Sequence, residues 1–226
     1  MDRDDPAYDG QREYTPLFLR IYDPVVLGFL APVVWRCPAS RLVEQYRRHV
    51  GPRHLDVGPG TGYFLEHAGL PDGSPVTLLD PNVDVLDHAS RRLPRLDVTA
   101  VEADVLKPLP VEGPFDSAAL NGVLHCLPGP PPRKAAAVAN VAAVLDPGGV
   151  LFGASILGRS ARHRWLGRRV LESNNRRGTF DNLDDTEAGL RDILEASFER
   201  VELDTVGSMA VFAARHPRSS ATDGTP

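Results

Sequence analysis

A glycine-rich loop gives the clearest chemical signal in this sequence. The short apolar run His54–Val57 leads into Gly58, Gly60 and Gly62, and Tyr63–Leu65 has the character of a helix start. Glycines between a strand and a helix permit a tight turn and let the backbone approach a ligand closely. The loop therefore predicts a site for a small ligand at the end of a buried strand.

The residue ahead of this loop narrows the kind of ligand. The spacing is G-x-G-x-G, whereas the dinucleotide fingerprint would require its last glycine at the position of Tyr63. The carboxylate of Asp56 would repel a pyrophosphate, but it suits a ligand that carries an ammonium and a sulfonium. Both features disfavour a nicotinamide-dependent oxidoreductase, which is the main alternative for a loop of this kind.

Two further acids follow apolar runs that have the character of strands. Asp80 follows Val76–Leu79, and Asp104 comes shortly after Val98–Val101. Taken singly, Asp80 could cap the following helix and Asp104 could lie in an ordinary turn. Ligands of parallel α/β sheets bind at the carboxyl ends of the strands, so the joint placement of the acids predicts one shared crevice.

These motifs resemble those of the class I S-adenosylmethionine-dependent methyltransferases. Asp56, Gly58, Gly60 and Gly62 match the first motif of that family, acid-x-Gly-x-Gly-x-Gly, and Asp80 matches the acid that grips both ribose hydroxyls. Further motifs continue in order, so that the resemblance covers residues 53–157. It implies S-adenosylmethionine as the cofactor and S-adenosylhomocysteine as the product.

The resemblance also implies which residues surround the adenine and the reacting centre. Pro81 and Asn82 stand where the family packs a side chain on the adenine. Asp104 would accept a hydrogen bond from the exocyclic amine, and the Val105 N–H would reach a ring nitrogen. Asn121 follows the fourth strand, where the family builds the floor of its active site, and we count it among the cofactor-binding residues.

Methyl transfer from a sulfonium requires an aligned nucleophile and sometimes a base. His125 is a candidate base, with a role in holding its loop or lining the cofactor as the alternative. Tyr14 and Tyr22 are further candidate catalytic groups, although both could simply pack. No His/Asp/Glu cluster has metal-ligand spacing, so we expect no metal. The Asn/Asp-Pro-Pro-aromatic signature of enzymes that methylate nucleobase or glutamine amino groups is absent.

The segment 159–177 contains seven arginines and one acid, Glu172. We predict that Arg164 and Arg168, with Trp165, bind the acceptor, because arginines suit a carboxylate, phosphate or enolate. The alternative is a solvated helix face.

Apolar runs with strand character alternate with helical stripes, which predicts a parallel sheet covered on both faces. The fold class is therefore α/β, a Rossmann-like seven-stranded, mostly parallel sheet. Val201–Val206 and Ala210–Ala214 flank Gly207-Ser208-Met209, which predicts a closing hairpin with an antiparallel edge strand. Asn82 and Thr186 are predicted helix caps, and a helical stripe from Val138 to Leu145 is expected to end at Pro147-Gly148-Gly149.

This reading divides the chain into three parts. Residues 1–50 hold a disordered tail and an N-terminal helical cap, which is either a packed layer or a lid. Residues 51–215 hold the methyltransferase core with an insertion at 158–185. Residues 216–226 form a second disordered tail.

Composition limits the partners and the compartment. The formal net charge of −5 gives no sign of a basic nucleic-acid-binding face. The two cysteines form no disulfide framework, the acidic start is unlike a signal peptide, and the apolar run at 25–35 is too short to span a bilayer. We expect a cytoplasmic enzyme, without membrane or nucleic-acid partners, that methylates a small-molecule acceptor, a specialised metabolite. The alternatives are an RNA or protein methyltransferase and a protein that binds S-adenosylmethionine without transferring methyl.

Overall fold

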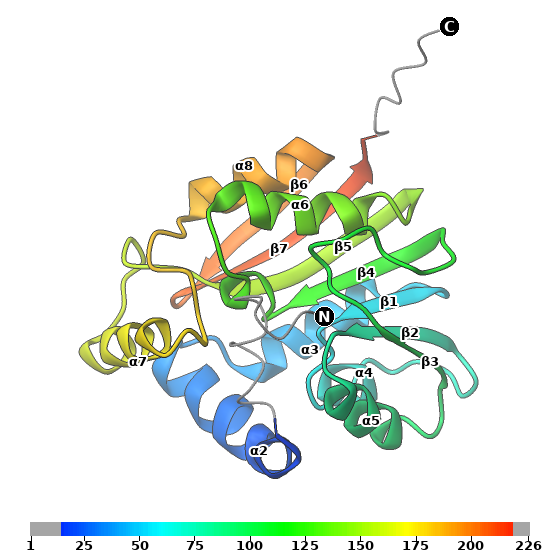
Figure 1. Ribbon diagram of the computed structural model, residues 1–226, viewed down its shortest axis with the longest axis horizontal. Helices are drawn as coiled ribbons and strands as arrows, with labels where there is room; N and C mark the ends of the chain where they lie inside the picture. The colour runs from blue at the N-terminus through cyan, green and yellow to red at the C-terminus, as the bar shows by residue number, and fades with distance from the viewer. Residues whose placement is uncertain (1–14, 219–226) are drawn as a thin grey trace, which may run out of the picture.

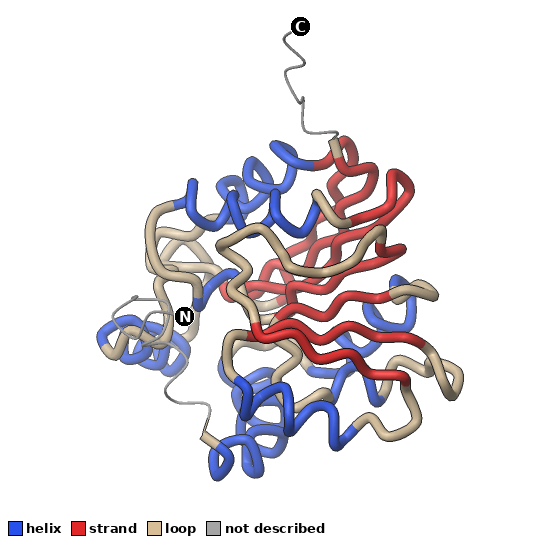
Figure 2. Tube along the Cα trace, turned by 45° about the vertical axis from the view of Figure 1, so that its right-hand side comes forward, coloured by secondary structure: helices blue, strands red, loops and turns tan. Residues whose placement is uncertain are grey.

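A twisted seven-stranded sheet runs through the centre of the protein, with helices on both of its faces (Figures 1 and 2). The computed structural model describes residues 15–218, so the candidate catalytic residue Tyr14 lies outside the described residues. The strand order is β3-β2-β1-β4-β5-β7-β6. The strands are β1 His54–Val57, β2 Pro75–Asp80, β3 Asp97–Glu102, β4 Phe115–Asn121, β5 Leu145–Ile156, β6 Phe198–Val206 and β7 Met209–Pro217.

The predicted Rossmann-like arrangement is confirmed. The apolar runs His54–Val57, Val76–Leu79 and Val98–Val101 lie within β1, β2 and β3, and the five strands β1 to β5 pair in parallel. Strand β1 lies between β2 and β4, so the carboxyl ends of these three strands meet at one edge of the sheet. The glycine loop, Asp80 and Asn121 are therefore brought together by the topology.

The second half of the sheet contains the predicted closing hairpin. Strand β6 forms the edge of the sheet and pairs antiparallel with β7, which lies between β5 and β6. The apolar run of β7 is buried on both faces, whereas only Phe198 and Leu203 of the edge strand β6 are buried. The predicted end of the preceding helical stripe is wrong, since α6, Pro131–Ala142, ends before Pro147 and Leu145 already opens β5.

The helices after β1 connect the strands, and two of them begin at the predicted N-cap residues. They are α4 Tyr63–Glu66, α5 Val83–Arg92, the short 3-10 helix η2 Leu124–Cys126, α6 Pro131–Ala142, α7 Trp165–Arg176 and α8 Glu187–Ser197. The side chain of Asn82 accepts a hydrogen bond from the Asp84 N–H, and that of Thr186 accepts one from the Gly189 N–H. Both predicted N-caps are confirmed.

The segment predicted as an N-terminal helical cap divides into a core helix and a separate cap helix. Helix α3, Ala39–His49, belongs to the core, because Tyr46 lies edge-on to Phe152 of β5 at 5.0 Å between ring centroids. The cap itself is α2, Pro16–Tyr22, continued by the π-helix η1, Asp23–Val34. π-Helical geometry is frequent at functional sites. At the other end of the chain, β7 extends to Pro217, two residues into the predicted C-terminal tail.

Candidate cofactor and acceptor site

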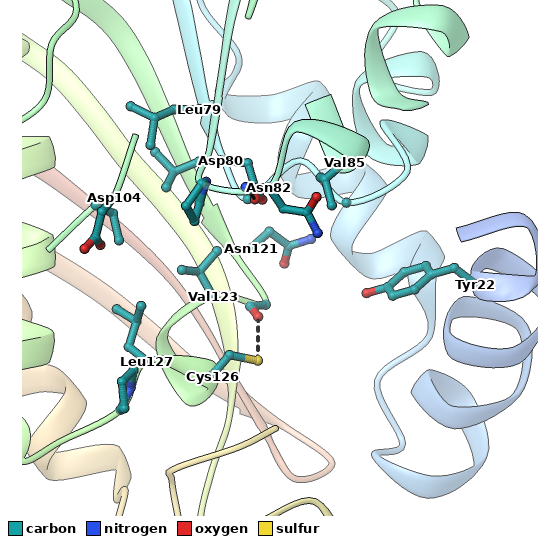
Figure 3. A pocket seen from close by; sticks show the side chains of 17 residues that line it. Tyr22, Leu79, Asp80, Asn82, Val85, Asp104, Asn121, Val123, Cys126 and Leu127 are labelled. Atoms are coloured by element: carbon teal, nitrogen blue, oxygen red, sulfur yellow. Dashed lines mark hydrogen bonds between the residues drawn. The ribbon is translucent and has the colours of Figure 1, made fainter. Parts of the chain in front are cut away.

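A cavity lies at the carboxyl ends of β1, β2 and β4 (Figure 3). Most of the residues predicted to bind the cofactor line it, although they come from separate loops. They are Gly58, Gly60, Asp80, Pro81, Asn82, Asp104, Val105 and Asn121. The cavity is also lined by apolar residues that the sequence analysis did not single out, among them Leu79, Val85 and Leu127.

The glycine loop requires glycine for its backbone and for its packing. Gly58, Gly60 and Gly62 have φ angles of 68°, 56° and 76°, in the left-handed region. A Cβ at Gly58 would lie 2.6 Å from Val123 Cγ2, whereas a Cβ at Gly60 would meet nothing within 4 Å. Gly62 packs against the Ala89 backbone of α5 and does not line the cavity, so its predicted cofactor contact is replaced by a structural role.

Two buried oxygens in the cavity wall have no hydrogen-bond partner among the described residues. Asp104 accepts from the Leu106 N–H through Oδ1 at 2.9 Å, while its Oδ2 is unpartnered, as is Oδ1 of Asn121. Buried polar atoms are normally paired, so these oxygens indicate a ligand that supplies donors. The amines and hydroxyls of S-adenosylmethionine fit this requirement. We therefore assign the cavity to the cofactor.

Asp80 lies at the opposite side of the same cavity, at the end of β2. Its Oδ1 accepts a hydrogen bond from the Asn82 N–H at 2.8 Å. Burial disfavours the charged form and raises the pKa of Asp80 to about 7. A pair of ribose hydroxyls would donate to this carboxylate and stabilise its charged form.

The predicted contact between Asp56 and the cofactor is not supported by its position. Side chains alternate along β1, and that of Asp56 points to the face opposite Leu55 and Val57, toward α3. Its two carboxylate oxygens accept from the Tyr46 hydroxyl at 3.2 and 3.1 Å, and Asp56 does not line the cavity. Asp56 therefore supports the strand beneath the glycine loop, where burial raises its pKa to about 7.

A second cavity adjoins the first and shares Tyr22, Asn121 and Gly122 with it. The hydroxyl of Tyr22 points from the cap toward Asn121 (Figure 3). The wall of the second cavity is mainly apolar and aromatic, and none of the described residues that line it is Asp, Glu, Lys or Arg. The residues from the cap and the body that give it this character are Phe18, Val26, Leu30, Trp35, Leu42, Phe64, Ile156, Phe180 and Met209.

His125 lines the second cavity but is poorly suited to act as a general base. Its Nδ1 accepts a hydrogen bond from the Ile156 N–H at 3.3 Å, and its ring packs edge-on against Phe180. Burial lowers the pKa of His125 to about 3. With Nδ1 accepting, the ring proton is assigned to Nε2, so His125 can donate a hydrogen bond in this cavity. The prediction of a catalytic base is corrected accordingly.

The predicted acceptor-binding residues of the arginine-rich segment face away from the site. Arg164, Trp165 and Arg168 are exposed and line neither cavity. The same segment contributes Asn174 from the inner side of α7, and Thr179 and Phe180 follow in the next loop. Sequence analysis missed these residues, because only the helical register of α7 shows which of its side chains turn inward.

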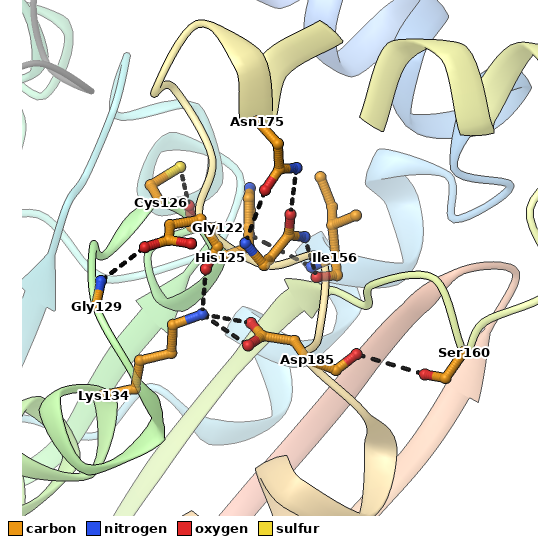
Figure 4. Close-up of polar contacts among 11 residues, drawn as sticks. Gly122, His125, Cys126, Gly129, Lys134, Ile156, Ser160, Asn175 and Asp185 are labelled. Carbon is orange, nitrogen blue, oxygen red and sulfur yellow. Dashed lines mark hydrogen bonds and ion pairs between the residues drawn. The ribbon is translucent and has the colours of Figure 1, made fainter. Parts of the chain in front are cut away.

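A buried lysine ties the loop that carries Phe180 to the body of the protein (Figure 4). Lys134 Nζ of α6 donates to both carboxylate oxygens of Asp185, at 2.7 and 2.6 Å, and to the Asp181 carbonyl at 2.7 Å. The Asp181 N–H in turn donates to the His125 carbonyl at 3.0 Å. Lys134 thus holds the loop that forms one wall of the second cavity. The sequence did not predict this role, because Lys134 lies in an alanine-rich helix without a recognisable motif.

An amide pair closes the other end of the same loop (Figure 4). Asn175 and Asn182 exchange two hydrogen bonds, at 2.9 and 3.1 Å, and Asn182 Nδ2 donates to the Ile156 carbonyl at 2.8 Å. This arrangement fixes α7 against β5, and neither asparagine lines one of the two cavities.

The ionisation of Asp80 predicts a pH dependence for product binding. The raised pKa of Asp80 means that the ligand-free fold favours the protonated acid, and that this contribution to stability is lost as pH rises through about 7. Ribose hydroxyls require the carboxylate. We therefore expect the affinity for S-adenosylhomocysteine to rise about tenfold between pH 5 and pH 6 and to level off above pH 7.

Calorimetric titration at several pH values measures this dependence. Asp80→Asn is expected to bind weakly with a flat profile, whereas Asp56→Asn, which removes an acid outside the cavity, should retain the dependence. A profile for Asp80→Asn that parallels the wild type would show that Asp80 does not hold the ribose.

The sheet order, the glycine loop and the cavity at the strand ends together define the class of Rossmann-like proteins that bind S-adenosylmethionine. Comparison with known proteins agrees with this class. The sequence profile described as a methyltransferase domain matches residues 55–151. With the relatives described next, this match shows that the chain belongs to the class I S-adenosylmethionine-dependent methyltransferase family.

The similar proteins of known role are methyltransferases of small molecules. The demethylluteothin O-methyltransferase of Streptomyces thioluteus is 41% identical over 217 residues, covering 93% of each chain. The physcion biosynthesis cluster O-methyltransferase of Aspergillus chevalieri is 36% identical, covering 94% of this chain and 97% of that protein. The N-methyltransferase vrtF of Penicillium aethiopicum is 38% identical, covering 81% and 78%.

Solved structures show the same fold at low sequence identity. The N-methyltransferase NodS of Bradyrhizobium japonicum, in complex with S-adenosylhomocysteine, superposes with a TM-score of 0.64 at 17% identity, covering 95% of this chain and all of that chain. PigF with S-adenosylhomocysteine superposes with a TM-score of 0.65, covering 94% of this chain and 62% of that one. The protein is thus an S-adenosylmethionine-dependent methyltransferase.

Proposed function

We propose that this methyltransferase acts on an oxygen of a neutral, largely apolar aromatic metabolite that carries an acidic hydroxyl. The observation that supports this proposal is the second cavity, which is aromatic, has no Asp, Glu, Lys or Arg among its described lining residues, and opens to the cofactor cavity at Tyr22, Asn121 and Gly122. A permanent anion such as a carboxylate, held away from the sulfonium, would lose its hydration there without gaining a cation from the described lining residues.

The wall residues align the acceptor within the second cavity. S-adenosylmethionine, when bound, supplies an electrophilic methyl group on a good leaving group. The aromatic rings of Phe18, Trp35 and Phe180 would contact the flat body of the acceptor. Tyr22 and Asn121, at the junction of the cavities, would orient the hydroxyl that receives the methyl group. Such alignment is the main contribution a protein can make to this displacement.

The chemistry of the wall favours an acidic hydroxyl over an aliphatic alcohol. The histidine in the second cavity has its pKa lowered to about 3, and no Asp, Glu, Lys or Arg is among the described residues that line this cavity. The acceptor must therefore release its proton to water before or during transfer, which phenols and enols do far more readily than aliphatic alcohols. Two relatives are named O-methyltransferases, while vrtF is named an N-methyltransferase, which makes an uncharged aromatic amine the second candidate.

Turnover with a set of matched acceptors tests this proposal. The purified protein is incubated with S-adenosylmethionine and neutral phenols, enolic pyrones, aromatic amines, aromatic carboxylates or aliphatic alcohols. We expect S-adenosylhomocysteine and methyl ether to form with the phenols or enols, at a rate that follows the ionisation of the acceptor. Preferential turnover of carboxylates or aliphatic alcohols would contradict the proposal.

The same assay addresses the other functions that the sequence left open. A protein that binds S-adenosylmethionine without transferring its methyl group would give no S-adenosylhomocysteine with any acceptor. An RNA or protein methyltransferase would need an open, basic groove beside the cofactor, whereas the adjoining cavity is aromatic and lies beneath the cap.

A further inference from the structure

The cap helix presents a row of apolar side chains to solvent. Leu17, Ile21, Val25, Phe29 and Val33 are 72%, 49%, 40%, 50% and 49% exposed. They recur at every fourth position and therefore lie along one face of the continuous helix formed by α2 and η1. A contiguous exposed apolar face of this kind marks an interaction surface. We refer to these five residues as the apolar row.

Other side chains of the same helix face the body of the protein and the cavities. Its acid, Asp23, accepts hydrogen bonds from Thr61 and Arg92 of the body, and Phe18 and Tyr22 face the cavities. The window Leu17–Val34 has a mean hydropathy of 1.7 over 18 residues but is only 17% buried. By length and composition alone it could cross a membrane, so the expectation that the apolar run at 25–35 is too short to span a bilayer is corrected: the run is part of a longer apolar helix. Core helices of soluble proteins pass the same test, so its exposure is the decisive observation.

Helix α7 extends this surface with positive charge. Arg168, Arg169 and Arg176 are exposed, and the only other exposed residue within the helix is Trp165, at 74%. Arg164, at its N-cap, is exposed as well. Helix α7 lies beside the end of η1 (Figure 1), where a Cβ added at Gly167 would be 3.2 Å from the Val34 carbonyl oxygen. The exposed arginines of α7 thus lie on a helix that adjoins the end of the helix carrying the apolar row.

We propose that the apolar row, Trp165 and the arginines of α7 dock the protein on an anionic lipid bilayer. Interfacial helices combine an apolar face with flanking cationic residues, and tryptophan favours the boundary between lipid and water. A second copy of the chain could cover the apolar row but would leave the arginines of α7 without an anionic partner, whereas an anionic bilayer matches both features. The rest of the chain is acidic overall, which makes this basic patch a local feature.

Docking at this surface would place the acceptor cavity next to the bilayer. Phe18, Tyr22, Val26 and Leu30 line the cavity from the same helix whose neighbouring face carries the apolar row. Apolar metabolites dissolve in bilayers, so an acceptor could enter from lipid beneath the cap. The docking proposal itself does not depend on the chemistry of the acceptor.

Vesicle binding by the full-length protein tests the proposal. The vesicles are of phosphatidylcholine alone or with about one-quarter phosphatidylglycerol, and binding is followed by co-sedimentation and by tryptophan fluorescence. Of the two tryptophans, Trp35 is 4% exposed and Trp165 is 74% exposed, so a blue shift on binding reports Trp165. We expect binding to the anionic vesicles at least about tenfold stronger than to the neutral ones, and weakened by salt.

Variants assign the binding to this surface. Ile21→Ser with Phe29→Ser should reduce binding to anionic vesicles about tenfold, as should Arg164, Arg168 and Arg169 all replaced by Gln. Val83→Ser is the matched control, because Val83 is also 49% exposed but lies on α5. The affinity for S-adenosylhomocysteine is the folding control. It should be unchanged in all of these variants, because none of the substituted residues lines the cofactor cavity.

Three outcomes would overturn the proposal. The first is a wild-type protein that binds neither kind of vesicle. The second is binding that the variants leave intact, which would assign it to another surface. The third is a dimer in analytical ultracentrifugation that the Ile21→Ser, Phe29→Ser variant disperses, which would assign the apolar row to a second copy of the chain.

Discussion

Replacing Asp80 with alanine is expected to weaken S-adenosylhomocysteine binding by about 3 kcal/mol or more, which is roughly a hundredfold or more in Kd. The carboxylate of Asp80 lies in the cofactor cavity at the end of β2, where two ribose hydroxyls can each donate a charge-assisted hydrogen bond. Asp104→Ala should have the smaller effect, about 1.5 kcal/mol, because its one unpartnered oxygen would accept a single hydrogen bond.

Calorimetric titration of the two variants and the wild type decides between these roles. Asp84→Ala is the matched control, because Asp84 is an exposed carboxylate in the first turn of α5 that does not line the cavity. Thermal unfolding of the ligand-free proteins confirms that each variant is folded. If Asp80→Ala bound the product as tightly as the wild type, the assignment of the ribose to the end of β2 would be wrong.

Replacing Lys134 with methionine is expected to destabilise the protein by about 3 kcal/mol. The lysine side chain is 4% exposed and that of Asp185 is 21% exposed, so the substitution leaves a mostly buried carboxylate without its cation. The loop that carries Thr179 and Phe180 is then held less firmly. We therefore also expect a higher KM for the acceptor, while the affinity for S-adenosylhomocysteine stays close to that of the wild type.

Urea unfolding and a double-mutant cycle separate loss of the ion pair from loss of packing. Lys134→Met combined with Asp185→Leu removes both charges and should recover much of the lost stability. Arg41→Met is the matched control, because its pair with Glu44 is exposed and should contribute less than about 1 kcal/mol. A double variant no more stable than Lys134→Met, with an unchanged acceptor KM, would contradict the proposed role of this pair.

The local pattern of the sequence was sufficient to bring most of the residues predicted to bind the cofactor to one cavity. Strand ends in a parallel sheet converge by topology, so Asp80, Asp104 and Asn121 could be assigned to one crevice before their positions were known. The glycine loop follows from backbone conformation, which depends mainly on the local residues. The local pattern did not predict which way a side chain points. The side chain of Asp56, which was expected to contact the cofactor, lies on the face of β1 that packs against Tyr46.

The second cavity, which we propose as the acceptor site, could be assigned only from the tertiary structure. Its wall combines the cap, the strand ends and the loop after α7, which are far apart in the sequence. The arginines that charge alone suggested for acceptor binding remain in solvent, because a charged group enters an apolar cavity only at a large desolvation cost.

The sequence by itself thus determined the sheet, the cofactor and the class of reaction, since these depend on periodicity and on short motifs whose chemistry is local. Tertiary packing decided which residues face the acceptor. It buried His125 so that its pKa falls to about 3, and it turned Asn174 inward and Trp165 outward from the same helix. Burial and helix orientation depend on contacts between distant segments, and no single segment of the sequence specifies them.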